Sequence, residues 1–89
     1  MSIDENALQR LQAALDQNTT WPSRYLFKFI VPQGKVAVLM LLFEGAAYHL
    51  RDSKKGNYVG FTVEVEMPSS NAVAEIYRKA SKIEGIIAL

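Results

Sequence analysis

The chain has 89 residues, of which 49% are hydrophobic and 21% charged, with a formal net charge of +1 at pH 7. This length fits one domain, and the composition is ordinary for a globular chain, which argues against wholesale disorder. The chain has no cysteine and one histidine, which excludes a disulfide framework, a thiolate metal site, a cysteine nucleophile and a multi-histidine zinc site.

Residues 3–17 are predicted to form an amphipathic helix. Leu8, Leu11 and Leu15 recur at helical spacing and make one apolar face. The helix ends before Trp21-Pro22, because the residue that precedes a proline disfavours helical backbone. We therefore expect residues 1–19 to be a helical extension and residues 20–89 to be a ferredoxin-like domain, as the rest of the chain indicates.

Residues 24–31 are predicted to form a strand, which Pro32 ends. Both faces are largely apolar, as in a central strand of a sheet. If Phe27 and Phe29 face the helices, Lys28 lies on the open face of the sheet.

Residues 33–44 are predicted to form a helix, although a continuous apolar run also fits a buried strand. Leucine, methionine and alanine favour a helix, and Gly45 stands where a C-terminal cap belongs. We expect its inward face to hold Val36, Leu39, Met40 and Phe43. The remaining apolar side chains then need a second neighbour, either the N-terminal helix or a partner subunit: Val38, Leu41 and Leu42.

Two strands are predicted over residues 46–52 and 58–67, joined by a hairpin turn at residues 53–57. A helix then opens at residues 68–71, with Ser69 or Ser70 as its N-cap, and runs to about Ile83. Gly85 caps it, and residues 86–89 form a last short strand. The order β-α-β-β-α-β predicts an α+β ferredoxin-like sandwich, with a four-stranded antiparallel sheet and two helices on one face.

Four segments of the chain form a recognisable series: WPSRYLFKFIVP at residues 21–32, SKKGNY at 53–58, IYR at 76–78 and IEGIIAL at 83–89. In this order they resemble the YbeD-like family of small bacterial proteins of unknown function, over about residues 20–89. The resemblance implies a ferredoxin-like fold close to ACT regulatory domains, and no established activity.

The protein is expected to be cytoplasmic, without a membrane-spanning segment. Its first residues are acidic and polar, unlike a secretory signal, and its longest apolar run, residues 36–43, is too short to cross a bilayer. Residues 21–56 carry six basic groups against two acidic ones, a local charge of +4. This bias is milder than nucleic-acid binding requires.

Five residues are candidate contacts for a partner or an effector: Lys28, Lys54, Lys55, Asn57 and Tyr58. The structural alternative for Lys28 is an ion pair with Glu64 or Glu66 of the neighbouring strand. The turn with the two lysines could offer ammonium groups and amides to a phosphate, but it lacks the P-loop pattern, and a solvated hairpin tip explains it better.

No catalytic, cofactor or metal site is predicted. His49 and Arg51 share one face of their strand while Asp52 points away, and no nucleophile is tied to them. Glu64 and Glu66 share a face, where solvent-facing alternation explains them.

The predicted function is a non-catalytic regulatory or binding module that resembles ACT-type domains and binds a partner protein or a small effector. Surplus apolar surface supports this, since Leu26, Ile30 and Tyr58 are expected on the open face and monomers seldom leave such patches bare. Either the N-terminal helix or a second copy of the chain would cover such surface, and the resemblance to ACT-type domains, which usually pair, implies a homodimer. An RNA-binding module with the topology of the RNA-recognition motif is an alternative, although Tyr58 and Phe61 are expected on opposite faces. A small enzyme is a further alternative.

Overall fold

The computed structural model describes residues 3–52 and 56–89. In chain order the elements are α1 (Glu5–Asn18), β1 (Ser23–Pro32), a 3-10 turn η1 (Gln33–Lys35), α2 (Val36–Leu42), β2 (Tyr48–Asp52), β3 (Tyr58–Met67), α3 (Ser70–Ala80) and β4 (Ile87–Ala88). Most of the predicted hairpin turn, residues 53–55, lies outside the described residues. No described helix combines the length and apolarity that crossing a membrane requires.

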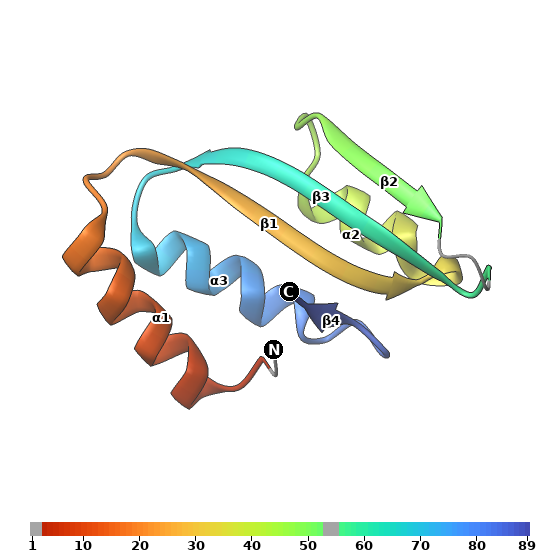
Figure 1. The fold of residues 1–89 in the computed structure, drawn as a ribbon, viewed down its shortest axis with the longest axis horizontal. Coiled ribbons are helices and arrows are strands. Elements are labelled where there is room, and N and C mark those ends of the chain that lie inside the picture. The colour runs from red at the N-terminus through yellow and green to blue at the C-terminus, as the bar shows by residue number, and fades with distance from the viewer. Residues whose placement is uncertain (1–2, 53–55) are drawn as a thin grey trace.

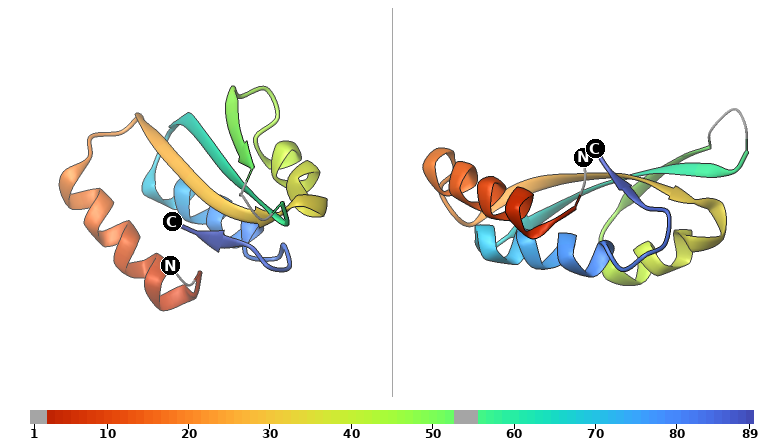
Figure 2. Two further views of the ribbon diagram at one scale, coloured as in Figure 1. Left: turned by 45° about the vertical axis from the view of Figure 1, so that its right-hand side comes forward. Right: turned by 90° about the horizontal axis from the view of Figure 1, so that it is seen from below.

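The four strands form one antiparallel sheet in the order β2-β3-β1-β4. α2 and α3 lie on one side of this sheet and leave its other face open, while α1 lies beside α3 (Figures 1 and 2). β1 and β3 pair over ten residues each, whereas β2 and β4 are short edge strands. This is the ferredoxin-like sandwich that the order of elements predicts.

The core lies between the sheet and α2 and α3, because alternate side chains of β1 and β3 point toward the helices. Tyr77 of α3 is 2% exposed and lies against Phe27 and Phe29, with ring centroids 5.4 and 5.8 Å away. Its hydroxyl shares a hydrogen bond with that of Tyr25, with 2.9 Å between the oxygens. Burial, and then this hydrogen bond, raise the pKa of Tyr77 above its ordinary value.

Residues 36–42 are helical, as predicted, and not a buried strand. Val36, Leu39 and Phe43 are buried and Met40 is half-buried, which confirms the predicted inward face. The helix is shorter than the predicted 33–44 because its start is a 3-10 turn without a side-chain cap and its backbone leaves helical geometry at Phe43.

The N-terminal helix packs against α3, so the first of the two neighbours considered for the remaining apolar side chains of α2 is wrong. Leu8 is 1% exposed, and Arg78 of α3 donates from Nε and Nη2 to the carboxylate of Glu5, at 3.0 and 3.1 Å. Figure 1 shows α1 and α2 toward opposite ends of the molecule, so contact between them is impossible. Val38 and Leu41 of α2 therefore remain exposed.

The bounds of α3, β2 and β4 also differ from the predicted ones. α3 begins after the N-cap Ser69, whose Oγ accepts from the backbone N of Ala72 at 3.1 Å, but it ends at Ala80 because the next turn closes with i→i−3 hydrogen bonds. β2 begins at Tyr48 rather than at residue 46, and β4 has two residues rather than four. Gly85 between α3 and β4 has φ +81°, a left-handed conformation that suits glycine.

Candidate functional site

The open face of the sheet is the candidate binding surface, and alternation along each strand decides its members. Phe27, Phe29, Phe61 and Val63 are buried on the helix side, so their neighbours in sequence point to the other side. The described members of the open face are Arg24, Leu26, Lys28, Ile30, His49, Arg51, Tyr58, Gly60, Thr62, Glu64, Glu66, Ile87 and Leu89.

Apolar side chains make up much of this face. Leu26 is 48% exposed, Tyr58 44%, Ile87 45% and Leu89 64%, and Ile30 is half-buried. Ile87 lies opposite Ile30, and the backbone N of Leu89 donates to the carbonyl of Lys28 at 2.9 Å. The β1–β4 side of the face is therefore largely aliphatic.

The cations of the open face differ in whether they are neutralised. Arg24 Nε donates to Glu64 Oε1 at 2.8 Å, across the strands. Lys28 lies opposite Thr62 and Arg51 opposite Gly60, and within the described residues neither cation forms an ion pair. The alternative in which Lys28 pairs with Glu64 or Glu66 is therefore wrong.

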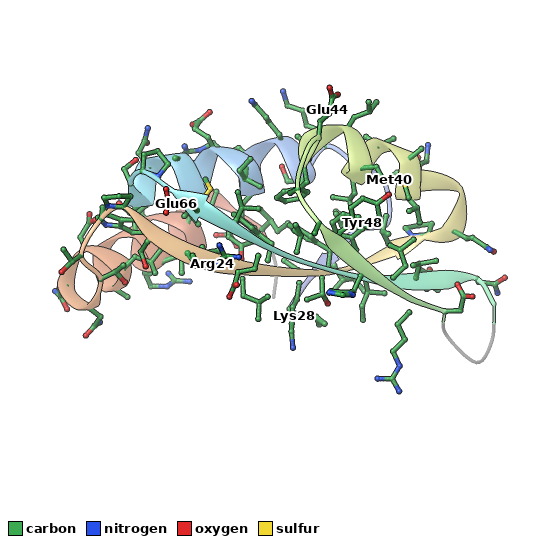
Figure 3. All side chains as sticks on the ribbon, turned by 90° about the horizontal axis from the view of Figure 1, so that it is seen from above. Arg24, Lys28, Met40, Glu44, Tyr48 and Glu66 are labelled. Atoms are coloured by element: carbon green, nitrogen blue, oxygen red, sulfur yellow. The ribbon has the colours of Figure 1, made fainter. Side chains whose placement is uncertain are left out.

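The structure places two of the five predicted contact residues on this face. Lys28 is exposed and points away from the helices (Figure 3), and Tyr58 begins β3 opposite Pro32. Asn57 is exposed at the end of the sheet, where its carbonyl accepts from the backbone N of Gln33 at 3.0 Å. Lys54 and Lys55 lie outside the described residues.

Sequence reasoning missed three contributors to the face. The sequence pattern around Arg51 suggests only a strand position next to His49, and that of Ile87 and Leu89 only a short last strand. The sequence does contain a signal that Ile87 and Leu89 point to the open face. Ala88 between them is small and apolar, and it points toward the helices, where it is fully buried. Their importance depends on β4 lying beside β1, which single-strand patterns do not reveal.

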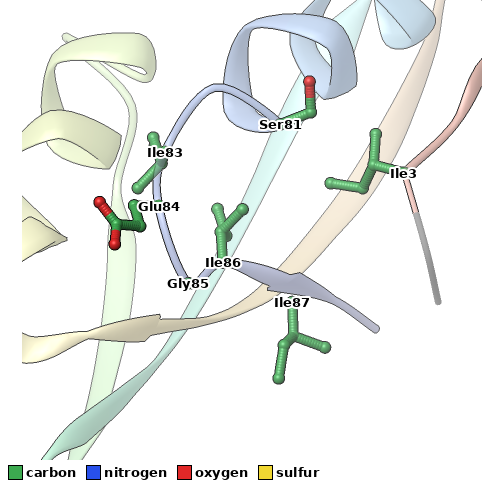
Figure 4. Close-up of a pocket in the computed structure, with 7 residues that line it drawn as sticks. All are labelled: Ile3, Ser81, Ile83, Glu84, Gly85, Ile86 and Ile87. Carbon is green, nitrogen blue, oxygen red and sulfur yellow. The ribbon is translucent and has the colours of Figure 1, made fainter.

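The described residues show no catalytic constellation. His49 lies opposite Thr62, and no group of three or more His, Asp or Glu side chains among these residues could hold a metal. A pocket of about 410 Å³ lies between the end of α3, β4 and Ile3, and it shares Ile87 with the open face (Figure 4). Its lining contains neither Lys28 nor His49: Ile3, Ser81, Ile83, Glu84, Gly85, Ile86 and Ile87.

The open face also lacks the stacking platform of an RNA-recognition motif. Tyr58 is exposed, but Phe61 and Phe27 are fully buried on the helix side, and Gly60 stands between Ile30 and Arg51. This confirms the predicted phases of β3. Tyr58 and the imidazole of His49 are therefore the aromatic rings of this face among the described residues, and the paired aromatics that the third strand of an RNA-recognition motif carries are absent from described β3.

A comparison with known protein families shows which family the chain belongs to. The family model "Protein of unknown function (DUF493)" matches residues 16–89. The chain belongs to this family. The match agrees with the YbeD-like resemblance and leaves most of α1 outside the shared region. No curated protein and no solved structure matches the chain significantly.

Proposed function

We propose that the protein is a non-catalytic regulatory module of the cytoplasm that binds a partner protein through the open face of its sheet. The observation that supports this is the combination, on one face of the sheet, of exposed aliphatic side chains with two cations that form no ion pair among the described residues. Monomeric proteins rarely expose contiguous apolar patches without a function. In this proposal the module also forms a homodimer, because apolar side chains of α2 and β2 are exposed on the helix side as well.

The charge on the face indicates the chemistry of the partner. Lys28 precedes Ile30 by two residues on β1, and Arg51 of β2 lies opposite Gly60, which in turn lies opposite Ile30. A segment that carries acidic and apolar side chains would bury Leu26 and Ile87 and place its carboxylates against these cations. The pocket near Glu84 contains neither cation, which favours a protein segment over a small effector.

A designed peptide tests the proposal. The probe alternates glutamate and leucine, and a matched control peptide has lysine in place of every glutamate. Amide chemical shifts of the isotope-labelled protein should move on β1, β3 and β4 with the glutamate peptide and should move far less with the lysine peptide.

Charge variants then distinguish binding at the open face from a general effect of the protein's net charge. Lys28→Glu should weaken binding of the glutamate peptide by about tenfold or more, since reversing the charge replaces an attraction with a repulsion. Lys79→Glu makes the same charge change on an exposed residue of α3 and should leave the affinity within about twofold. Equal losses from both variants, or shifts confined to the helices, would refute binding at the open face.

A further inference from the structure

No described strand pairs with the outer edge of β2, and we propose that a second copy of the chain pairs with it, β2 against β2, antiparallel about a two-fold axis at Leu50. This inference rests on the homodimer of the proposed function and names its interface. It does not depend on binding at the open face.

β2 has the properties of an edge that is built to pair. It is the terminal strand of the sheet, only β3 pairs with it among the described strands, and all five of its residues are exposed. Its ladder with β3 runs from Tyr48↔Val63 to Asp52↔Val59 without a bulge. Edge strands of monomers are usually protected by bulges, prolines, charged side chains or short length. β2 has no bulge and no proline, and its protection is limited to its length of five residues and the charges of Arg51 and Asp52.

The sequence of β2 is complementary to itself in one register. A two-fold axis at Leu50 places Leu50 opposite Leu50 of the partner subunit, Tyr48 opposite Asp52 of the partner subunit, and His49 opposite Arg51 of the partner subunit. This register keeps each residue on its own face and pairs the whole strand. The tyrosine hydroxyl can donate to the carboxylate and the guanidinium to the neutral imidazole, so every pair is compatible, as a two-fold interface requires.

Apolar side chains on the helix side extend this interface beyond the backbone. Tyr48 stacks on Phe61 with ring centroids 5.1 Å apart, and Leu50, 45% exposed, lies opposite Phe61 in the ladder. α2 lies on this side of the sheet, where Figure 3 shows Met40 and Tyr48 on the same side of the molecule. Its Leu41 is 71% exposed, so pairing along β2 brings two uncovered α2 helices toward one axis.

The oligomeric state of charge variants tests this interface. We expect the unmodified protein to sediment as a dimer, and Leu50→Lys to raise the dissociation constant by about tenfold or more, because two ammonium groups then meet at the axis. Leu26→Lys is the matched control: Leu26 is 48% exposed against 45% for Leu50, but it lies on the open face. A monomeric unmodified protein would overturn the inference, as would a dimer that Leu26→Lys dissociates and Leu50→Lys does not.

A cross-link gives a second test that survives poor folding of the lysine variants. The chain has no cysteine, so Leu50→Cys introduces a single thiol. Directly opposed residues of antiparallel strands have Cβ atoms about 4.5–5.5 Å apart, close to the reach of a disulfide. Mild oxidation, which removes one proton and one electron from each thiol, should convert Leu50→Cys to a covalent dimer much faster than Leu26→Cys. Equal rates would overturn the proposed axis.

The two proposals can fail separately. If Leu50→Lys is monomeric and still binds the glutamate–leucine peptide, both proposals stand. If it is monomeric and neither it nor the unmodified protein binds the peptide, only the open-face function fails. If the protein binds the peptide but β2 variants leave the dimer intact, only the β2 interface fails.

Discussion

Substituting Leu8 by alanine measures how far α1 is part of the folded domain. Leu8 is 1% exposed although most of α1 lies outside the region that the family shares. Complete burial of a leucine side chain contributes about 2 kcal/mol, and the cavity left behind adds to the loss, so Leu8→Ala should lower the free energy of unfolding by about 3 kcal/mol. The ion pair between Glu5 and Arg78 contributes far less, because water screens exposed charges.

Thermal and urea unfolding provide the assay. For a domain of this size about 3 kcal/mol corresponds to a decrease in Tm of about 12 °C or more. Leu26→Ala is the control, since Leu26 is 48% exposed and its truncation should cost less than about 1 kcal/mol. A Leu8→Ala protein no less stable than this control would show that α1 is not docked on α3, and the account of its packing would be wrong.

Three further substitutions test individual contacts. Gly85→Ala should destabilise the protein by about 1–3 kcal/mol, measured by urea unfolding, because φ is +81° and the new Cβ would lie 2.8 Å from Cγ of Pro32; unchanged stability would contradict that approach. The raised pKa of Tyr77 means that stability is retained up to the ordinary value of 10.0 and lost as the pH rises further, so Tyr77→Phe should flatten this alkaline decline in Tm. Hydrogen bonds from the arginine of α3 lower the pKa of Glu5 below its ordinary value of 4.5, so stability present above that pH is lost as the pH falls through the lowered pKa. Glu5→Gln should remove this acid-dependent loss, and an unchanged acid profile would mean that the pair is absent in solution.

The sequence predicts the sheet and α2 well because local patterns decide them. The strict alternation of β3 fits one orientation only, the aromatic side chains on one face of β1 favour that face for the core, and leucine, methionine and alanine in residues 36–42 favour a helix over a strand. The packing of α1, in contrast, cannot be predicted from local patterns. Its leucine face fits any apolar groove, and the contact between Glu5 and Arg78 joins residues 73 positions apart, so no local pattern could choose α3 over α2.

The candidate site is predictable only as far as strand phase allows. Alternation places Lys28 on the open face, but the partner of Glu64 depends on the register. Glu64 lies directly opposite Leu26, so Arg24 and Lys28 are both diagonal to it, and the ion pair forms with Arg24. Strand phase could not choose between these two cations, and Lys28 forms no ion pair among the described residues. The aliphatic side of the face was underestimated for a similar reason, since Ile87 and Leu89 join it through the pairing of a two-residue strand.

The two proposed surfaces share β2 without competing for it, because successive residues of a strand point to opposite faces. Tyr48 and Leu50 lie on the helix side, whereas His49 and Arg51 lie on the open face. Antiparallel pairing about a two-fold axis keeps these faces together, so the open faces of two copies become one continuous surface with Arg51 of each copy at the seam. A peptide with two glutamate–leucine segments in tandem should therefore bind the dimer more tightly than a single segment does, through effective concentration. Leu50→Lys should abolish this advantage and leave the affinity for the single segment unchanged. Isothermal titration of both peptides against both proteins measures this, and an advantage that persists in a monomeric Leu50→Lys protein would contradict the shared surface.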